Sequence, residues 1–342
     1  MLLTGHTGFK GSWASLWLEH LGAEVAGYAL APDQSPDLFS RLAPFTGATS
    51  TIGDLSDFDR LAALASDFAP QIVLHMAAQP LVRRSYRNPR ETFATNVQGT
   101  ANLLDAVRGL AGVEAVLAVT TDKVYAIDGM DRPFLESDRL GGHDPYSASK
   151  AAAEIVVASY AASFFAPAGI PLASARAGNV VGGGDWSEDR LIPDIWRAMR
   201  AGRTLELRYP QATRPWQHVL EPVAGYLLLL EALVERPDTT PRALNFGPAP
   251  GADEVSVAAV AEAFAGALGN DRPWEQAPGE HPHETSALAL DAGAAIGALG
   301  WRPRLDANAT LEWTANWYRG YDAGRNARAL TLAQIEAYEA LA

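Results

Sequence analysis

Residues 4–11 read TGHTGFKG, and this stretch decides the fold. It follows a short apolar run and precedes a segment, 13–21, in which Trp and Leu recur at helical spacing. A strand, a glycine-rich turn and a helix in this order predict the first βα unit of a Rossmann-type sheet. In such a unit the glycines permit a tight turn, close approach to a pyrophosphate and close packing of the helix on the strand. Because the turn already begins at Gly5, either the first strand is short or the true start lies slightly upstream.

Apolar runs and helical periodicities alternate through the first half of the chain. Strands are expected near 23–30, 71–75, 115–120 and 172–176, with helices near 13–21, 61–68, 89–107 and 146–165. Further helices are expected near 191–201, 219–234, 257–268, 292–299 and 307–318. The alternation predicts an α/β fold, a doubly wound parallel sheet with helices on both faces. We predict a Rossmann domain over 1–180 and a smaller, discontinuous C-terminal substrate lobe over 181–342, with segments near 219–247 returning to the first domain.

Composition narrows the class of protein. The 342 residues are 48% hydrophobic and 20% charged, which is typical of a globular chain. A net charge of −13 argues against a nucleic-acid or anionic-membrane surface as partner. The chain contains no cysteine, which fits a reducing cytoplasm and excludes thiolate chemistry. The longest apolar stretch, 225–234, is too short to span a bilayer, and no export signal is visible.

The glycine turn predicts a dinucleotide site, since a helix N-terminus offers N–H groups and a favourable dipole to a pyrophosphate. An acid for the adenosine ribose is expected about 20 residues on, where Asp33 is the nearest candidate. No arginine stands beside it in the sequence to accept a 2′-phosphate, so NAD is favoured over NADP. Asp54 either lies near the adenine or has only a structural role. In the second case Asp54 or Ser56 caps the next helix. The residues expected to contact the cofactor are Gly5, Thr7, Gly8, Phe9, Lys10, Gly11, Asp54, Leu55, Ala77, Ala78, Gln79, Asn96, Tyr146 and Lys150.

A reactive group is predicted where Tyr146 and Lys150 stand at i and i+4 on one helical face. The cation can lower the pKa of the phenol, so that tyrosinate accepts a proton from a substrate hydroxyl while hydride leaves the same carbon. Thr121, Asp122 and Lys123 follow a buried strand directly, at the edge where parallel sheets bind ligands. Thr121 could donate to the reacting oxygen. The alternative, a solvated loop, is disfavoured because the charges follow the strand so closely.

Several motifs together resemble the CDP-glucose 4,6-dehydratase family of extended short-chain dehydrogenases. They are TGHTGFKG (4–11), HMAAQP (75–80), TDK (121–123), DPYSASK (144–150), RAGNVVGGGDW (176–186) and RPWQHVLEP (214–222). The resemblance runs from residue 2 to about residue 320. It implies a lyase with NAD as cofactor, a nucleotide-sugar such as CDP-glucose as substrate, a homodimer, and a place in deoxysugar supply for lipopolysaccharide O-antigen.

The resemblance also implies a mechanism. NAD takes hydride from sugar C4 while Tyr146, supported by Lys150 and Thr121, removes the O4 proton. Water is then eliminated across C5–C6, and hydride returns to C6. Asp122 matches the acid for the departing C6 hydroxyl, and Lys123 stands where related dehydratases carry a glutamate base. To take the C5 proton, Lys123 must be neutral, so its pKa would have to fall well below about 10.

Substrate contacts are expected from Gln79, Ser85, Thr121, Asn179, Arg214 and His283. Asn179 matches an asparagine near the sugar diphosphate, and Arg214 is the best local cation for that group. His281 and His283 stand at metal-ligand spacing, but no carboxylate partner or metal-dependent step accompanies them, so no metal is predicted. His218 is expected to be structural.

One departure from the family pattern stands at residues 126–130, where AIDGM replaces an NREW-like stretch close to the reacting sugar. This leaves the exact sugar and nucleotide base open. A nucleotide-sugar epimerase or reductase would share the Tyr-Lys pair but would not need Asp122 and Lys123. A non-catalytic NAD-sensing protein would need none of these residues.

Overall fold

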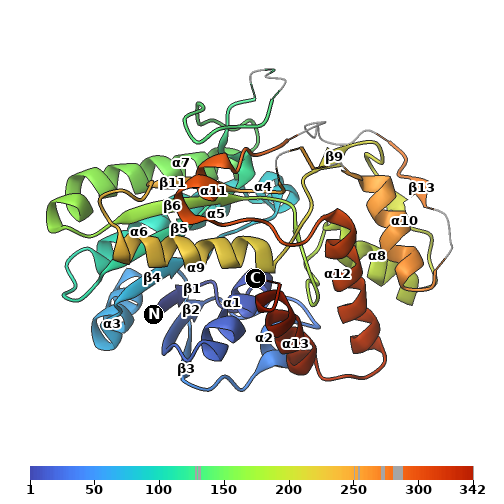
Figure 1. Cartoon of the computed structure of the whole chain (residues 1–342), viewed down its shortest axis with the longest axis horizontal. Helices are drawn as coiled ribbons and strands as arrows, with labels where there is room; N and C mark the ends of the chain where they lie inside the picture. The colour runs from blue at the N-terminus through green and yellow to red at the C-terminus, as the bar shows by residue number, and fades with distance from the viewer. Residues whose placement is uncertain are drawn as a thin grey trace.

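A seven-stranded parallel sheet forms the centre of the molecule (Figure 1). The computed structural model describes residues 1–127, 129, 132–249, 251–252, 255–270, 274–279 and 288–341. The strand order is β11-β6-β5-β4-β1-β2-β3, and every neighbouring pair is parallel. The strands are β1 (Leu2–Thr4), β2 (Val25–Ala29), β3 (Ala48–Ile52), β4 (Ile72–His75), β5 (Ala115–Val119), β6 (Leu172–Ala177) and β11 (Ala243–Phe246). The predicted doubly wound sheet is confirmed, including the three-residue first strand.

Helices cover both faces of the sheet. One face carries α3 (Phe58–Phe68), α6 (Gly99–Val107) and α7 (Pro145–Tyr160), which pack side by side. The other carries α1 (Phe9–His20) and α9 (Leu220–Glu235), also in contact. Each face has its own buried apolar cluster. The sequence-predicted helix over 89–107 is built from α5 (Pro89–Phe93), the π-helical η1 (Ala94–Gln98) and α6, and α7 continues through η3 (Ala161–Phe165) and the 3-10 turn η4 (Ala166–Ala168).

A second group of helices lies beside the sheet, at the right of Figure 1. Helix α10 (Val257–Ala267) packs against both α8 (Leu191–Arg200) and α12 (Ala307–Asp322). Short strand pairs connect this region: β7 (Val180–Val181) with β10 (Gln217–His218), β8 (Glu206–Leu207) with β13 (Glu275–Gln276), and β9 (Thr213–Arg214) with β12 (Val255–Ser256). The division of the chain near residue 180 stays a prediction.

Two segments of the second half of the chain lie against the first half. Strand β11 pairs with β6 at the edge of the main sheet, as expected for segments near 219–247, and α11 (Gly293–Leu299) packs near it. Helix α13 (Ala327–Glu339) was not predicted; it packs on α1 and on the short α2 (Leu38–Leu42). Trp17 on α1 donates from Nε1 to Glu339 Oε1 at 2.7 Å. The C-terminal helix therefore completes the cover of the α1 face.

One helix of the described chain, Pro145–Ala168, is long and apolar enough to cross a membrane by length and composition, and it is 24 residues long. This helix is α7 with its extensions η3 and η4. It packs along α6 and carries Tyr146 and Lys150. A core helix of a soluble protein meets the same criterion.

Candidate active site

The glycine turn is closed too tightly for side chains at two of its three glycines. Gly5 has φ +77°, and a Cβ there would stand 2.6 Å from the backbone nitrogen of Ala77. A Cβ on Gly11 would stand 2.0 Å from the carbonyl oxygen of Gly5. Gly8, the exposed N-cap residue of α1, meets only that same carbonyl oxygen, at 3.4 Å. The turn thus presents bare backbone at a helix N-terminus, which fits the pyrophosphate of a dinucleotide.

The end of β4 is held to the same turn. Thr4 Oγ1 accepts hydrogen bonds from the backbone N–H groups of Met76 and Ala77, both at 3.2 Å. The buried Asn96 fixes the following residues, accepting from the Gln79 N–H at 2.8 Å and donating to the Gln79 carbonyl at 3.1 Å. The Gln79 side chain donates to Thr92 and accepts from the Leu81 N–H. Both Gln79 and Asn96 therefore shape the segment that follows β4.

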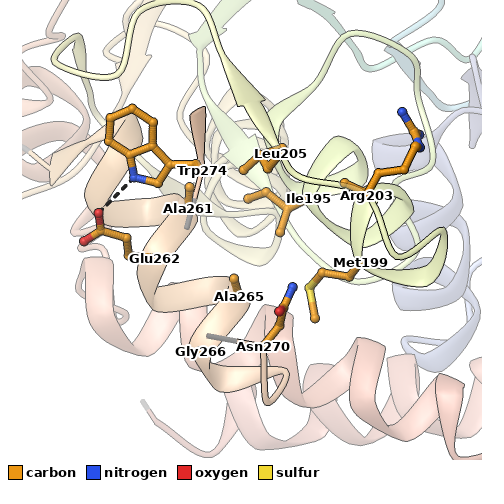
Figure 2. A pocket seen from close by; sticks show the side chains of 11 residues that line it. Ile195, Met199, Arg203, Leu205, Ala261, Glu262, Ala265, Gly266, Asn270 and Trp274 are labelled. Atoms are coloured by element: carbon orange, nitrogen blue, oxygen red, sulfur yellow. Dashed lines mark hydrogen bonds between the residues drawn. The ribbon is translucent and has the colours of Figure 1, made fainter. Parts of the chain in front are cut away.

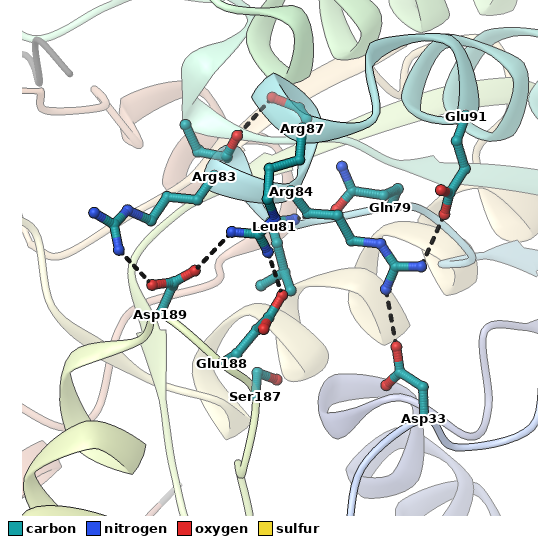
Figure 3. A network of polar contacts seen from close by, with 12 residues as sticks. Asp33, Gln79, Leu81, Arg83, Arg84, Arg87, Glu91, Ser187, Glu188 and Asp189 are labelled. Atoms are coloured by element: carbon teal, nitrogen blue, oxygen red, sulfur yellow. Dashed lines mark hydrogen bonds and ion pairs between the residues drawn. The ribbon is translucent and has the colours of Figure 1, made fainter.

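Helix α4 takes part in an ion-pair cluster that the local sequence does not reveal (Figure 3). Arginines of α4 (Val82–Arg87) reach carboxylates on three other segments of the chain. The pairs are Arg83–Asp189 at 2.7 Å, Arg84–Asp33 at 2.9 Å, Arg84–Glu91 at 2.8 Å and Arg87–Glu188 at 2.7 Å. Asp33, the acid nearest the expected ribose position, is thus paired with an arginine 51 residues further along the chain.

Asp54 takes part in a turn of its own. Its Oδ1 accepts from the Ser56 N–H at 2.8 Å, and its carbonyl accepts from the Tyr28 hydroxyl at 2.9 Å. The cap of α3 is Asp57, whose side chain accepts from the Arg60 N–H. Neither Asp54 nor Ser56 caps the helix, so that alternative was wrong. Leu55 is buried next to them.

Tyr146 and Lys150 are both buried on α7, a helix started by Asp144 as N-cap and by Pro145 in its first turn. The Tyr146 N–H donates to Ser85 Oγ at 3.1 Å, which ties the predicted Ser85 to the start of this helix. Lys150 Nζ donates to the Val119 carbonyl at 3.0 Å. Burial lowers the pKa of Lys150 to about 8, and the charge of Glu154 opposes this.

The pKa of Tyr146 differs from the expectation that a nearby cation lowers it. Burial raises the pKa of Tyr146 to about 12, and a hydrogen bond with the Thr121 hydroxyl opposes the rise. In this arrangement desolvation of the phenolate outweighs every favourable contact. The phenol needs a further positive group at the site before it can act as a base near neutral pH.

The Thr121-Asp122-Lys123 triplet follows β5 directly and turns into the short 3-10 helix η2 (Asp122–Val124). The Asp122 side chain is 1% exposed, whereas that of Lys123 is 30% exposed. Thr121 Oγ1 donates to Asp122 Oδ1 at 2.8 Å, and Lys123 Nζ lies 3.6 Å from the same oxygen. A buried acid, a cation and a hydroxyl thus meet next to Tyr146.

Asp122 is also held from its other side. Asn179, with φ +51°, donates from Nδ2 to Asp122 Oδ2 at 3.2 Å. The preceding Gly178 lies so close that a Cβ there would stand 2.0 Å from Asp122 Cγ. Asn179, predicted as a substrate contact, is therefore a direct partner of the acid.

A second lysine, the half-buried Lys10, and the buried Tyr226 stand near the first pair. Lys10 Nζ donates to the Tyr226 hydroxyl at 3.2 Å, joining α1 to α9. Burial, and then the charges of Arg190 and Lys150, lower the pKa of Lys10 to about 7. Lys10 was predicted as a cofactor contact from its position in the turn, but Tyr226 and Arg190 were not predicted. Only the tertiary structure brings them to the site.

A buried ion pair next to the predicted catalytic group was not predicted from the sequence. Arg176 Nη2 lies 2.9 Å from Glu154 Oε2, and Arg176 Nε donates to Glu154 Oε1 at 3.0 Å. Arg176 Nη1 donates to the Tyr125 hydroxyl, which in turn donates to Asn245 Oδ1 at 2.6 Å. The sequence did contain a signal for this ion pair. Glu154 stands four residues after Lys150, and Arg176 lies in an expected strand.

Other predicted residues lie elsewhere or outside the description. Arg214 lies on β9 and donates from Nη1 to the Thr213 carbonyl. His218 is buried between Trp13 and Trp313, and burial lowers its pKa to about 3, which supports a structural role. His281 and His283 lie outside the described residues, as do positions 128 and 130 of the divergent stretch.

A cavity of about 560 Å³ opens between α8 and α10 (Figure 2). Apolar side chains such as Ile195, Met199 and Leu205 line it, and Trp274 donates to Glu262 at its rim. None of the described residues predicted for the site lines this cavity. The groups predicted to be catalytic gather at the carboxyl ends of β1, β4, β5 and β6 instead, where open α/β sheets bind their ligands.

Comparison with known proteins agrees with this geometry. Residues 1–247 match the model of the NAD dependent epimerase/dehydratase family. The chain is 44% identical to CDP-glucose 4,6-dehydratase of Salmonella typhimurium over 94% of this chain and 92% of that protein. It is 27% identical to dTDP-glucose 4,6-dehydratase of Xanthomonas campestris over 93% of this chain and 92% of that one.

Solved structures share the fold. UDP-glucose-4-epimerase of Stenotrophomonas maltophila, with bound NAD, superposes with a TM-score of 0.80 at 24% identity over 95% of this chain and 99% of that chain. UDP-glucose 4-epimerase of Thermus thermophilus, in complex with NAD, gives a TM-score of 0.76 at 25% identity over 93% and 98% of the two chains.

Proposed function

Because the chain belongs to the NAD dependent epimerase/dehydratase family, we propose that it converts CDP-glucose to CDP-4-keto-6-deoxyglucose, with NAD as its cofactor. One observation carries the choice of dehydration. Asp122 is buried, contacts Lys123 at 3.6 Å and is linked through Thr121 to Tyr146. An epimerase or reductase needs only the tyrosine and its lysine, whereas loss of water needs an added acid and base. The 44% identity to a CDP-glucose 4,6-dehydratase supports the same choice.

The proposed roles follow from where each side chain lies. Tyr146 removes the O4 proton, and the buried Lys150 supplies positive charge on the same helix face. NAD supplies the acceptor for the C4 hydride and returns that hydride to C6. Lys123 takes the C5 proton, and the buried Asp122 delivers a proton to the departing C6 hydroxyl. Two carbon centres are thus served by one cluster at the end of β5.

Product analysis tests the function. The purified protein is incubated with NAD and, separately, with CDP-glucose, dTDP-glucose, UDP-glucose and GDP-mannose. We expect a 4-keto-6-deoxy product from CDP-glucose alone, without net NADH, because the hydride is returned. An epimer, or net NADH without loss of water, would contradict the roles of Asp122 and Lys123. A 4-keto-6-deoxy product from another of these nucleotide-sugars would support the proposed reaction but assign a different nucleotide base to the substrate.

We also propose that the chain forms a homodimer through α5 and α7. Phe93 is 40% exposed, Ile155 62% and Phe164 41%. These apolar side chains lie on α5 and on α7 with its extension η3, two segments that pack against each other near η1. Sedimentation of the wild type and of Ile155→Lys tests this; a monomeric wild type would overturn it. A cytoplasmic location, supported by the absence of cysteine, and a role in O-antigen sugar supply are part of the same proposal.

A further inference from the structure

Gln217 is a buried polar residue to which the proposed mechanism gives no role. It lies on β10, within the RPWQHVLEP motif at 214–222, and is 3% exposed. Its Nε2 donates to two backbone carbonyls, that of Gly178 at 3.1 Å and that of Phe246 at 3.0 Å. Its backbone N–H donates to the Asn179 carbonyl at 3.3 Å. One residue thus holds both members of the two-residue connection between β6 and β7.

This connection is in direct contact with Asp122. Asn179 donates from Nδ2 to Asp122 Oδ2 at 3.2 Å. The bare backbone of Gly178 packs against the same carboxyl group, since a Cβ there would stand 2.0 Å from Asp122 Cγ. Asn179 has φ +51°, a left-handed conformation that asparagine adopts more readily than most residues. A shift of residues 178–179 would therefore reach the Asp122 carboxyl from two sides.

The hydrogen bonds of Gln217 tie this connection to the main sheet. Gly178 directly follows the last residue of β6, and Phe246 is the last residue of β11. The two strands pair in parallel, with Phe246 opposite Ala177. The Gln217 amide therefore bridges the carboxyl ends of neighbouring strands. Strand β11 is the fixed side of this bridge, because all four of its residues are paired with β6.

The amide achieves this at a cost to its own hydrogen bonding. Its orientation is set by its partners, because exchange of Oε1 and Nε2 would direct an oxygen at two carbonyl groups. In this orientation Oε1 is buried and accepts from none of the described residues. A buried acceptor without a partner lowers stability. Departures of this kind from the best local choice are expected where a residue serves function.

We propose that Gln217 is a positioning residue for the elimination step. It fixes residues 178–179 against β11 and so holds Asp122 where its carboxyl group can protonate the departing C6 hydroxyl. The inference rests on the proposed function, in which Asp122 is that acid. The side-chain hydrogen bonds of Gln217 go to residues 178 and 246 and not to α7, which carries Tyr146. Oxidation at C4 should therefore be spared when the Gln217 amide is removed.

The test compares Gln217→Met with the wild type on CDP-glucose, because methionine is close to glutamine in shape and has no N–H donor. Two rates are measured in a single turnover: formation of bound NADH by absorbance, and appearance of the 4-keto-6-deoxy product. We expect the ratio of elimination to oxidation to fall by about 10-fold or more, since a small displacement of a reacting group can cost about 10²-fold. Bound NADH then accumulates. A wild-type ratio in Gln217→Met, or an equal loss of both rates, overturns the inference.

Thr240→Val is the control for a merely structural effect. Thr240 is 8% exposed, and its hydroxyl donates to the carbonyls of Ala232 and Arg236 at the end of α9. This variant also removes a buried donor to backbone carbonyls, but its contacts lie outside the connection at 178–179. Urea unfolding should show a loss of stability in both variants, whereas the ratio of elimination to oxidation should fall only in Gln217→Met. An equal fall in both variants would contradict a positioning role.

A double variant tests whether the effect passes through Asn179. In Asn179→Ala the Asp122 carboxyl has already lost its amide partner, so adding Gln217→Met should lower the ratio by a smaller factor than it does in the wild type. Residues that act through one another show such non-additive effects, whereas independent sites do not. The same factor in both backgrounds would overturn the proposed route.

Gly178→Ala reaches the same connection without altering the Gln217 amide. The added Cβ must displace the Asp122 carboxyl, so the ratio of elimination to oxidation should fall and bound NADH should accumulate. Gly297→Ala on α11 is the matched control, because a Cβ there meets nothing within 4 Å. Equal ratios in these two variants would overturn the inference. Dehydration by the wild type in the same experiment shows that the proposed function stands even then, whereas a wild type that does not dehydrate CDP-glucose overturns both.

Discussion

Helix α7 carries two buried polar groups of opposite character. Tyr146, Lys150 and Glu154 follow one another at four-residue intervals and so share one helix face. The first group is Tyr146 with Lys150, in which burial raises the pKa of Tyr146 to about 12 and lowers that of Lys150 to about 8. The second group is Glu154 with its partners. Burial alone would raise the pKa of Glu154, but Arg176, Thr120 and Ser174 hold it below its ordinary value.

The difference lies in how well each charge is compensated. Glu154 receives a two-point contact from Arg176, with distances of 3.0 and 2.9 Å, and accepts from Ser174 Oγ at 2.8 Å. Among the described residues, the Lys150 ammonium donates only to the Val119 carbonyl, and it lies near a further cation, Lys10. A compensated group supports the fold, whereas an uncompensated one is available to a ligand or a reaction. The group that stabilises the fold and the group proposed for catalysis thus lie one helical turn apart.

The largest expected effect is on the reaction. Tyr146→Phe removes the base and should lower the rate of C4 oxidation by about 10²- to 10⁴-fold. The free energy of unfolding of this variant should stay close to that of the wild type, because the lost hydroxyl has few contacts that offset its burial. Single-turnover NADH formation and urea unfolding measure the two quantities. Marked destabilisation of this variant would show that the first group is structural as well.

The next effect is on stability. Arg176→Met leaves the Glu154 carboxylate buried without its cation and should cost about 3–5 kcal/mol in the free energy of unfolding. The double variant Glu154→Gln/Arg176→Met removes both charges and should recover part of that cost. Urea unfolding of the single and double variants measures it. If the double variant is no more stable than the single one, the cost comes from lost packing and the comparison fails.

A smaller effect is expected at Tyr125, which belongs to the second group but lies two residues from Lys123. Its hydroxyl donates to Asn245 at 2.6 Å and accepts from Arg176 at 2.8 Å. Tyr125→Phe should cost about 1–3 kcal/mol by leaving Asn245 without its donor. The ratio of elimination to oxidation should not change. A changed ratio would mean that the stabilising group also positions Lys123.

The sequence was most informative where function depends on local spacing. Tyr146 and Lys150 are one helical turn apart, and Thr121 to Lys123 directly follow a buried strand, so each set could be predicted without tertiary contacts. The parallel sheet followed from the alternation of apolar runs. Helix α13 was not predicted. It is stabilised by packing on α1 and α2, and this packing cannot be inferred from the sequence of the helix itself.

Contacts between distant segments could not be predicted. Arg84 meets Asp33 across 51 residues, and Asn179 meets Asp122 across 57. Lys10 was assigned by its place in the glycine turn, yet its side chain bonds Tyr226, which is 216 residues away. Residue spacing within one element says nothing about which loops a sheet edge brings together. The sequence therefore proposes which residues react, but it does not give the contacts that position them.

The smallest expected effect is a change with pH in folding stability, caused by Lys10, and it sharpens the comparison of the two groups. Burial lowers the pKa of Lys10 to about 7, whereas an unfolded lysine titrates near about 10.4. Below pH 7 both states bind the proton and the full cost of burying the ammonium is present. Between these pKa values the unfolded state binds more protons, so stability rises with pH, and above the higher value the cost is gone.

Lys10→Met should therefore stabilise the protein most at pH 7 and below, by about 2 °C or more in Tm, and the gain should fade toward pH 10. The gain is limited because the variant also loses the hydrogen bond to Tyr226. Calorimetry of both proteins without NAD across this range measures the difference. The control is Arg176→Met, whose deficit should show no such fading, because its cost comes from the buried Glu154 carboxyl, and ionisation of that group can only increase as the pH rises. If Lys10→Met is less stable than the wild type at pH 7, the Lys10 ammonium is compensated after all, and the catalytic group resembles the Glu154 pair.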